Sequence, residues 1–279
     1  MNENEIRNTI RRMAGRDASK AQALYCLFAM ERFLERVSRS DKADRFVVKG
    51  GVLVQSKVGV DSRATLDIDS TICHMTLDEQ SIKGFLNEVI AIPLDDGMSF
   101  EVKHLVPIRD EAEYPGLRAA MLASFSNLRI PFKIDFSTGE VMTPSAVLYD
   151  FPLLFGNRSI PIHAYNTETV LAEKIETILS RGIANTRMRD FYDIIVLPQI
   201  DSEQINYNLL MRAFERTNMA RGNRAKFERW RETVLTIQFD SRMNSLWNAY
   251  RKRYDYARDY AFSDAIRALS ALCEAMAAA

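Results

Sequence analysis

The sequence has few cysteines and few histidines. Three of each occur among 279 residues, and both sets are scattered along the chain. An odd number of distant cysteines excludes a disulfide framework, and the spacing excludes a zinc-ligand cluster. Neither a G-x-S-x-G turn nor a G-x-x-x-x-G-K motif occurs. The sequence therefore gives no support to a hydrolase or a P-loop protein.

Long apolar runs are also missing. The first 15 residues mix acids and bases where a signal peptide has a basic patch followed by an apolar run. No uncharged stretch reaches the roughly 18–20 residues that a membrane span requires. We therefore expect a soluble protein of the cytoplasm with no membrane partner.

Net charge is absent as well, because 37 basic residues balance 37 acidic ones. No global positive field indicates a nucleic-acid or membrane partner. The charge is uneven along the chain, however: residues 61–150 carry 15 acids against 7 bases, and residues 201–279 carry 13 bases against 10 acids. With 47% hydrophobic residues, the chain has an ordinary globular composition and is long enough for one large domain or two smaller ones.

Apolar periodicity predicts an α+β protein. The first part of the chain combines helical spacing with strict alternation, which indicates a mixed sheet with helices on it. The predicted helices are 20–38, 52–58 and 78–91, and the predicted strands are 46–48, 65–75, 98–108 and 128–136.

The second part of the chain predicts helices only. We expect a helix from Thr167 to Leu179 with Thr167 as its N-cap, and a second helix over 187–198 stopped by Pro198. Three or four further helical stretches follow, which predicts a C-terminal helical bundle. The expected domains are residues 1–165 and 166–279.

Asp67 and Asp69 are the most informative pair of acids. Side chains two apart in a strand share a face, so both carboxylates lie together while Leu66, Ile68 and Ser70 turn to the other face. Like charges this close repel unless a cation or a proton lies between them, and Mg²⁺ completed by a nucleotide phosphate suits such ligands. A solvated strand face is the alternative.

Asp135 is a third acid on the polar side of a strand. The apolar residues alternate with it and form the opposite face; they are Ile130, Phe132, Ile134 and Phe136. Three carboxylates on two strands suit a two-metal clamp for phosphoryl transfer, if the strands are neighbours.

Gly50 and Gly51 lie between a predicted strand and a predicted helix. Glycines there allow backbone N–H groups to approach a triphosphate, and a helix N-terminus favours anions. A plain tight turn explains the pair equally well.

Lys174 and Asp190 are charged residues on apolar helix faces. Lys174 lies among Val170, Leu171 and Ile178 on a helical wheel, as a cation aimed at phosphates or as a lysine snorkelling from the core edge. Asp190 needs a partner, which Arg187, Arg189 or Lys174 can supply, so a structural Lys174–Asp190 ion pair is an alternative. Asp193 is expected to be exposed or paired with an arginine.

A basic stretch covers residues 212–231, with seven bases against two acids. Its aromatic residues Phe214, Phe227 and Trp230 suggest either a surface that follows a nucleic-acid backbone and stacks bases, or a charged helix face with aromatics in the core.

Five segments in one order resemble a known family. These are KGGVLV, SRATLDIDSTI, KIDF, NTETVLAEKIETIL and RMRDFYDII, which together span about residues 45–197. In this order they resemble the AbiEii family of nucleotidyltransferase-like toxins, which includes the MenT toxins. The resemblance implies a DNA-polymerase-β-like nucleotidyltransferase core followed by a helical C-terminal domain that completes the active-site cleft.

The resemblance also implies roles for individual residues. Gly50 and Gly51 match the nucleotide-binding turn, Asp67 and Asp69 the paired catalytic metal carboxylates, and Asp135 the third strand acid. Lys174 and Asp190 match the family's essential lysine and aspartate. Apart from the resemblance, Arg63 lies six residues before Asp69 and is expected to reach the γ-phosphate; an exposed loop arginine is the alternative. The second glycine of the turn departs from the serine of many nucleotidyltransferases, so a phosphate contact there must come from a backbone N–H.

The implied function is Mg²⁺- or Mn²⁺-dependent transfer of a nucleoside monophosphate from an NTP to the 3′ end of tRNA. Such tRNA modification inhibits translation and growth, as in abortive infection, and a cognate antitoxin is the expected protein partner. Two alternatives stay open from the sequence. One is transfer to a small molecule or a protein hydroxyl, and the other is a catalytically silent protein that binds a nucleotide or an antitoxin.

Overall fold

The structure is a computed structural model that describes residues 3–61, 63, 65–108, 116–155, 157–200 and 205–279. Its contacts divide the chain into two compact units. The sheet unit comprises Met1–Ser56, Ala64–Glu140 and Val147–Ala164. The helical unit comprises Lys57–Arg63, Val141–Ala146 and Tyr165–Ala279. Within the described ranges, no helix has the length and apolar character needed to cross a bilayer.

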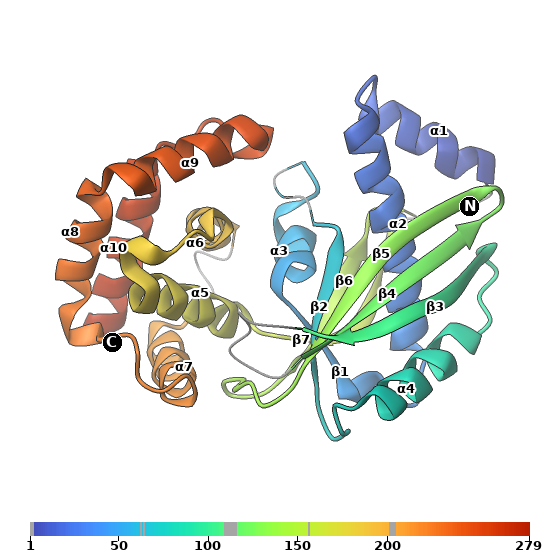
Figure 1. Cartoon of the computed structure of the whole chain (residues 1–279), viewed down its shortest axis with the longest axis horizontal. Helices are drawn as coiled ribbons and strands as arrows, with labels where there is room; N and C mark the ends of the chain where they lie inside the picture. The colour runs from blue at the N-terminus through green and yellow to red at the C-terminus, as the bar shows by residue number, and fades with distance from the viewer. Residues whose placement is uncertain (1–2, 62, 64, 109–115, 156, 201–204) are drawn as a thin grey trace. The chain divides into compact units, whose positions relative to one another are not determined.

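The sheet unit is built on a mixed sheet of seven strands (Figure 1). Its helices are α1 (Glu3–Ala14), α2 (Ala18–Ser38), α3 (Gly50–Val58) and α4 (Glu79–Ala91). Its strands are β1 (Phe46–Lys49), β2 (Asp67–Ile72), β3 (Met98–Pro107), β4 (Gly116–Phe125), β5 (Leu128–Ser137), β6 (Val147–Leu153) and β7 (Arg158–Ala164). The strand order is β3-β4-β5-β2-β1-β7-β6, in which β2 pairs with β5 and β1 with β7 in parallel and the other neighbours are antiparallel.

Three of these strands were not predicted from the sequence. β4 contains alanines and a methionine, which have weak strand propensity, although Ala119, Met121 and Ala123 are buried in strict alternation. β6 contains Pro152 and β7 contains Pro161, and proline cannot donate to a strand ladder. β6 lies at an edge of the sheet, where the missing donor is tolerated.

Aromatic side chains form much of the sheet unit's core. Helix α2 packs on β5 and β7, and α4 packs on β3. Phe33 of α2 lies 6.2 Å from Phe46 and 6.1 Å from Phe132, measured between ring centroids. All four apolar residues of β5 predicted to share one face are buried, which confirms that face. Leu66 is the exception on β2, because the strand begins at Asp67 and leaves Leu66 55% exposed.

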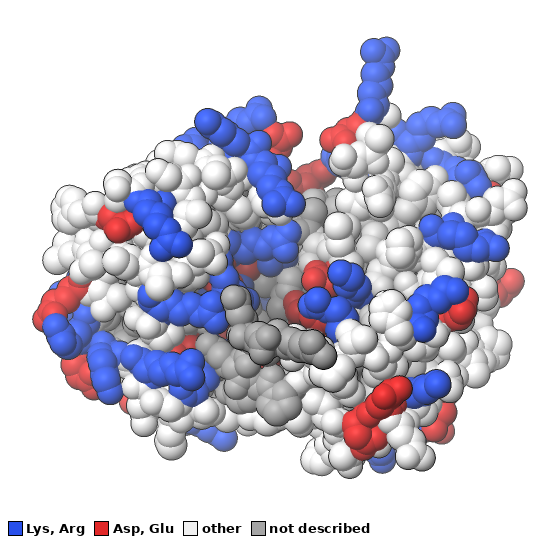
Figure 2. Space-filling view, viewed as in Figure 1, with Lys and Arg blue, Asp and Glu red and all other residues white. Residues whose placement is uncertain are grey.

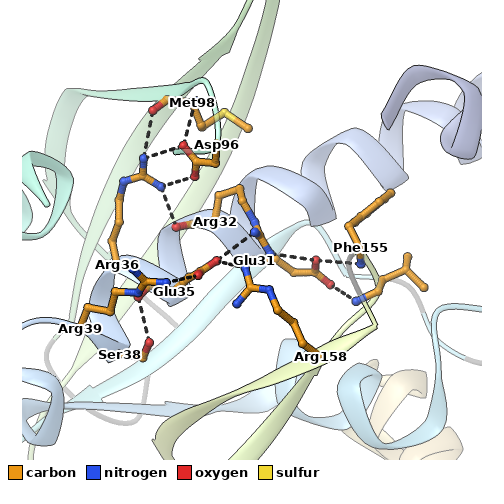
Figure 3. A network of polar contacts seen from close by, with 11 residues as sticks. Glu31, Arg32, Glu35, Arg36, Ser38, Arg39, Asp96, Met98, Phe155 and Arg158 are labelled. Carbon is orange, nitrogen blue, oxygen red and sulfur yellow. Dashed lines mark hydrogen bonds and ion pairs between the residues drawn. The ribbon is translucent and has the colours of Figure 1, made fainter. Parts of the chain in front are cut away.

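Charged residues of α2 tie distant loops to this core (Figure 3). Arg36 donates to both carboxylate oxygens of Asp96, at 2.7 and 3.0 Å. Glu31 accepts hydrogen bonds from the backbone N–H groups of Leu154 and Phe155, at 2.7 and 3.4 Å. Because Glu31 and Arg36 are buried, these contacts supply hydrogen-bond partners that water does not provide.

The helical unit packs around α5 and α10. Its helices are α5 (Thr167–Arg181), α6 (Met188–Ile200), α7 (Tyr207–Ala220), α8 (Trp230–Phe239), α9 (Ser241–Arg253) and α10 (Phe262–Ala278). Helix α5 contacts α6 and α7, and α10 contacts α6, α7 and α8. The predicted succession of helices after residue 165 is therefore confirmed.

Two predicted helix ends in this unit were wrong. The N-cap of α5 is Asn166, whose side chain accepts a hydrogen bond from the Thr169 N–H at 3.0 Å, and not Thr167. Helix α6 continues through Pro198 to Ile200. Pro198 lacks the N–H for one helical hydrogen bond. Because only two helical residues follow it, the last turn persists.

Candidate active site

A row of charged side chains crosses four adjacent strands of the sheet unit. Lys49 on β1 pairs in register with Asp69 on β2, and Asp69 pairs with Asp135 on β5. Asp135 pairs in turn with Arg118 on β4. Residues in register have their side chains on the same face of a sheet, so two negative charges lie between two positive charges across it. The parallel pairing of β2 with β5 thus brings together two acids that are distant in the sequence.

Asp67 extends this row along β2. It lies two residues before Asp69, on the same face, and accepts a hydrogen bond from Thr65 Oγ1 at 2.7 Å. Ile68 lies between the two acids and Ser70 follows Asp69, and both are fully buried on the opposite face. The predicted division of β2 into an acidic face and a core face is therefore present.

The carboxylate of Asp69 has too little positive charge around it. Burial raises its pKa above the ordinary value, and the negative charge of Asp67 raises it further. The Gly51 N–H and the Lys49 ammonium act in the opposite direction but do not compensate. A cation near Asp67 and Asp69 would relieve this repulsion.

Asp135 is held by an arginine that the sequence did not indicate. Arg118 Nε donates to Asp135 Oδ1 at 2.7 Å, and Arg118 Nη2 donates to Oδ2 at 2.6 Å. Both carboxylate oxygens are thus engaged in a two-pronged ion pair. In the described part of the chain, no group of three or more His, Cys, Asp or Glu side chains is arranged to hold a metal ion. Asp67 and Asp69 alone fit Mg²⁺, which takes one or two protein carboxylates and completes its shell with phosphate oxygens and water.

The Gly50–Gly51 turn is built against Asp69. Gly50 has a φ of +59°, in the region that favours glycine. A β-carbon on Gly50 would lie 2.2 Å from Asp69 Oδ2, and the N–H of Gly51 donates to the same oxygen at 3.1 Å. The turn joins a strand to a helix, as predicted, and it also fixes the position of the carboxylate.

Glu140 is a further acid near this row. It accepts hydrogen bonds from Lys49 Nζ and Thr71 Oγ1, and from Ser137 Oγ at 2.9 Å. Burial alone would raise the pKa of Glu140, but the Lys49 ammonium and these hydrogen bonds hold it below its usual value. Lys49 therefore divides its charge between Glu140 and Asp69. The sequence carries no signal for this role, because Glu140 lies in the irregular segment after β5.

A second charged cluster lies in the helical unit. Lys174 Nζ lies 3.0 Å from Asp190 Oδ1 and 2.6 Å from Asp193 Oδ2. Arg187 Nε lies 3.0 Å from the other oxygen of Asp190. The Lys174–Asp190 ion pair considered from the sequence is therefore present, as part of a larger network.

Asp193 and Arg63 are more deeply buried than the sequence suggested. Asp193 is 0% exposed, and Arg63 is 3% exposed. Arg63 Nε donates to Asp193 Oδ1 at 2.7 Å, and Arg63 Nη2 donates to Oδ2 at 3.2 Å. Of the two expectations for Asp193, pairing with an arginine was correct and exposure was wrong. Arg63 is not an exposed loop arginine, and its guanidinium is bound to a carboxylate.

Lys174 is charged in this setting. Burial alone would lower its pKa, but Asp193 and Asp190 together raise it above the ordinary value. A lysine that stays protonated around neutral pH acts by its positive charge and does not accept a proton. The geometry therefore suits an electrostatic role for Lys174.

The basic stretch over residues 212–231 runs from the second half of α7 through a loop to the start of α8. Phe214 and Trp230 are buried in the helical unit. Arg221 donates to Glu176 Oε2 at 2.6 Å and to Thr177 Oγ1 at 3.0 Å. Its principal aromatics and one of its arginines therefore belong to the packing of the bundle.

The chain is similar to known proteins in sequence and in fold. The family model described as "Nucleotidyl transferase AbiEii toxin, Type IV TA system" matches residues 32–268. A crystal structure described as a "putative nucleotidyltransferase from H. pylori" is 14% identical, with a TM-score of 0.50 over 91% of this chain and 94% of that one. The crystal structure of JHP933 from Helicobacter pylori is 13% identical, with a TM-score of 0.50 over 91% of each chain. At these identities the likeness concerns the fold. No curated protein matches the chain.

Proposed function

The chain belongs to the family of AbiEii nucleotidyltransferase toxins of type IV toxin–antitoxin systems, and from this premise we propose its acceptor, its metal dependence and its active residues. As a nucleotidyltransferase it uses an NTP. We propose that it transfers the nucleoside monophosphate to the 3′ end of tRNA with the help of Mg²⁺ or Mn²⁺, and so inhibits translation. The observation that carries the proposal is the register of Asp69 with Asp135, next to the Gly50–Gly51 turn.

Asp67 and Asp69 are the residues proposed to hold the metal ion. Their shared face and the raised pKa of Asp69 fit a hard cation with oxygen ligands. A divalent ion bound there would neutralise charge on the triphosphate and lower the pKa of the attacking hydroxyl. The Gly51 N–H and Lys49 keep the Asp69 carboxylate in place against burial and repulsion.

Asp135 is proposed to act on the attacking hydroxyl and to assist at the metal site. In the transfer step the acceptor oxygen forms a bond to the α-phosphorus, and the bond from that phosphorus to the bridging oxygen of the β-phosphate breaks. Pyrophosphate leaves with the bonding electrons, and the hydroxyl proton passes to the Asp135 carboxylate. Each Asp135 oxygen that accepts a hydrogen bond from Arg118 keeps a further lone pair, so the carboxylate can take the proton or bind metal while Arg118 holds it in place.

Lys174 is proposed to neutralise the charge that develops on the leaving pyrophosphate. Its raised pKa keeps the ammonium charged during the reaction. Asp190 and Asp193 orient this ammonium through ion pairs of 3.0 and 2.6 Å. Arg63, predicted to bind the γ-phosphate, acts in this proposal through Asp193, because its guanidinium donates to both oxygens of that residue.

A labelling experiment tests the proposed activity. Purified protein is incubated with each α-labelled NTP, Mg²⁺ and total bacterial RNA, in parallel with Asp69→Ala and Lys174→Ala variants. We expect label in a tRNA-sized band with the wild type and its loss in both variants. Label in a protein or a small molecule would instead identify a different acceptor, and no label in any fraction with any NTP would contradict the proposed transfer.

A growth experiment tests the toxin role in the cytoplasm. Expression of the wild type is expected to slow bacterial growth, and co-expression of the cognate antitoxin is expected to restore it. The Asp69→Ala variant serves as the matched control, because it removes one carboxylate from β2. Equal growth with the wild type and this variant would contradict the toxin role.

A further inference from the structure

A basic and aromatic surface covers the end of α9 and the turn that follows it. We call residues 248–258, which comprise the end of α9 and the 3₁₀ helix η4 (Asp255–Ala257), the α9–η4 surface. They carry four basic residues against one acidic residue. The last turn of α9 contributes Arg251, Lys252 and Arg253. In Figure 2, Lys and Arg side chains gather over the end of α9.

A pocket opens on this surface. It has a volume of about 550 Å³ and is lined by Asn248, Arg251, Lys252 and Arg258. Lys252 and Arg258 are exposed, and none of the four described residues that line the pocket is acidic. Arg258 is also ion-paired with Asp255, and Arg251 Nε donates to the Arg258 carbonyl at 3.0 Å. A pocket of this volume, with three cations and one amide, is large enough for a nucleotide phosphate with its sugar.

Two tyrosines of the α9–η4 surface lie close to these cations in the sequence. The rings of Tyr254 and Tyr256 stack, with centroids 5.4 Å apart and planes 27° apart. The guanidinium groups of Arg189 and Arg253 lie 5.3 and 5.4 Å from the centroid of Tyr254. Arg253 is exposed, and both tyrosines are partly exposed. Nucleobases stack on aromatic rings and on guanidinium planes, so these groups suit an unpaired base.

The tyrosines also adjoin the Lys174 cluster within the helical unit. Tyr256 lies 4.9 Å from Tyr192, which directly precedes Asp193 on α6. The Tyr250 ring also lies 6.3 Å from that of Tyr192, measured between ring centroids. A strand of nucleic acid that stacked on Tyr254 would therefore lie close to the cluster of Lys174, Asp193 and Arg63.

We propose that the α9–η4 surface binds single-stranded RNA, with phosphates at Arg251, Lys252 and Arg258 and a base at Tyr254. The inference rests on the proposed function only in taking RNA as the acceptor. It locates the acceptor contact outside residues 212–231, whose principal aromatics are buried. Phosphate contacts supply affinity that depends on salt, and stacking supplies affinity that does not.

Fluorescence anisotropy without NTP tests the phosphate contacts. The full chain is titrated into a labelled single-stranded RNA of ~12 nucleotides, within the usual site size of such surfaces. A triple variant, Arg251→Gln with Lys252→Gln and Arg258→Gln, is expected to bind at least tenfold more weakly. Its slope of log affinity against log salt is expected to fall by about 2, because each lost contact removes about 0.7.

A matched variant controls for the loss of three positive charges. Arg216→Gln with Arg224→Gln and Lys226→Gln removes three exposed cations of the 212–231 stretch. We expect its RNA affinity to stay within twofold of the wild type. Equal weakening by both triple variants, or no binding of RNA by the wild type, would overturn the proposal.

A third variant tests stacking. Tyr254→Leu is expected to weaken binding about fivefold or more with an unchanged salt slope, and Tyr254→Phe is expected to retain binding. A melting temperature equal to that of the wild type confirms that each variant is folded. Unchanged RNA affinity in folded Tyr254→Leu would contradict the base contact. Since no NTP is present, these results are independent of whether nucleotidyl transfer is observed.

Discussion

Gly50 at the start of α3 and Asp69 on β2 form one structural unit. A β-carbon on Gly50 would lie 2.2 Å from Asp69 Oδ2 and 2.8 Å from its Cβ. The residue after Gly50 donates its N–H to the same carboxylate oxygen. The turn at Gly50 therefore leaves space for the proposed metal ligand and also holds it.

Replacing Gly50 by alanine is expected to displace Asp69. Gly15 provides a matched control, because it also has a φ of +59° but has no atom within 4 Å of its β-carbon position. Gly15→Ala should cost about 1–2 kcal/mol from the left-handed backbone alone. Gly50→Ala should cost more in urea unfolding and should abolish nucleotidyl transfer. Equal costs and retained transfer would contradict the close approach.

Replacing Asp69 by asparagine is expected to stabilise the protein near neutral pH. The folded pKa of Asp69 is raised, so its carboxylate is destabilising once it is ionised. This penalty is absent below the unfolded pKa of about 4 and grows as pH rises through the folded pKa. Melting temperatures of wild type and Asp69→Asn should diverge in favour of the variant as pH increases. An asparagine variant that is less stable at every pH would refute this assignment.

Replacing Asp193 by asparagine is expected to destabilise the helical unit strongly. The change leaves the buried cations of Lys174 and Arg63 facing a neutral group, at a cost of about 3–5 kcal/mol. Asp190→Asn should cost less, because the Arg187 side chain that pairs with Asp190 is 58% exposed and can turn to water. Urea denaturation of both variants checks the order. A larger loss in Asp190→Asn would show that Asp190 is the principal partner of Lys174.

The acids on β2 were predictable from the sequence because the period of two in a strand places alternate residues on one face. The neighbour relationship of Asp69 and Asp135 was not, because it depends on parallel pairing between segments 66 residues apart, which alternation within one strand cannot specify. The arginine that holds Asp135 comes from β4, whose alanines gave no strand signal.

The charged clusters show the same limit. Lys174 and Asp190 lie on apolar faces of helices, and periodicity located them. The burial of Asp193 depends on its ion pair with Arg63, which lies 130 residues away in the sequence and could not be identified from it. Glu140 lies in an irregular segment after β5, where its contacts with Lys49 and Thr71 arise only from the fold.

Glu31 gives a separate pH-dependent prediction for the sheet unit. Burial raises its pKa to about 7. Ionisation of Glu31 is therefore less favourable in the folded state than in the unfolded state. The free energy of unfolding falls as pH rises from the unfolded pKa through about 7, by roughly 3 kcal/mol in total. Glu31→Gln removes this ionisation, although it changes the hydrogen bonds to Leu154 and Phe155.

The difference in unfolding free energy between Glu31→Gln and the wild type should therefore shift in favour of the variant between acid and mildly alkaline pH. Urea unfolding over this range measures it, and any constant effect of the altered hydrogen bonds cancels in the shift. Parallel pH dependences would show that Glu31 does not ionise in this range.

The most direct measurement of the central claim compares label transfer by the wild type, Asp69→Asn and Gly15→Ala. Each protein is incubated with α-labelled NTPs, Mg²⁺ and bacterial RNA after its folded state has been verified by thermal unfolding. The Asp67–Asp69 carboxylate pair predicts a labelled tRNA-sized band with the wild type and Gly15→Ala, and none with Asp69→Asn although that variant is the more stable protein. Transfer by Asp69→Asn at the wild-type rate would contradict it.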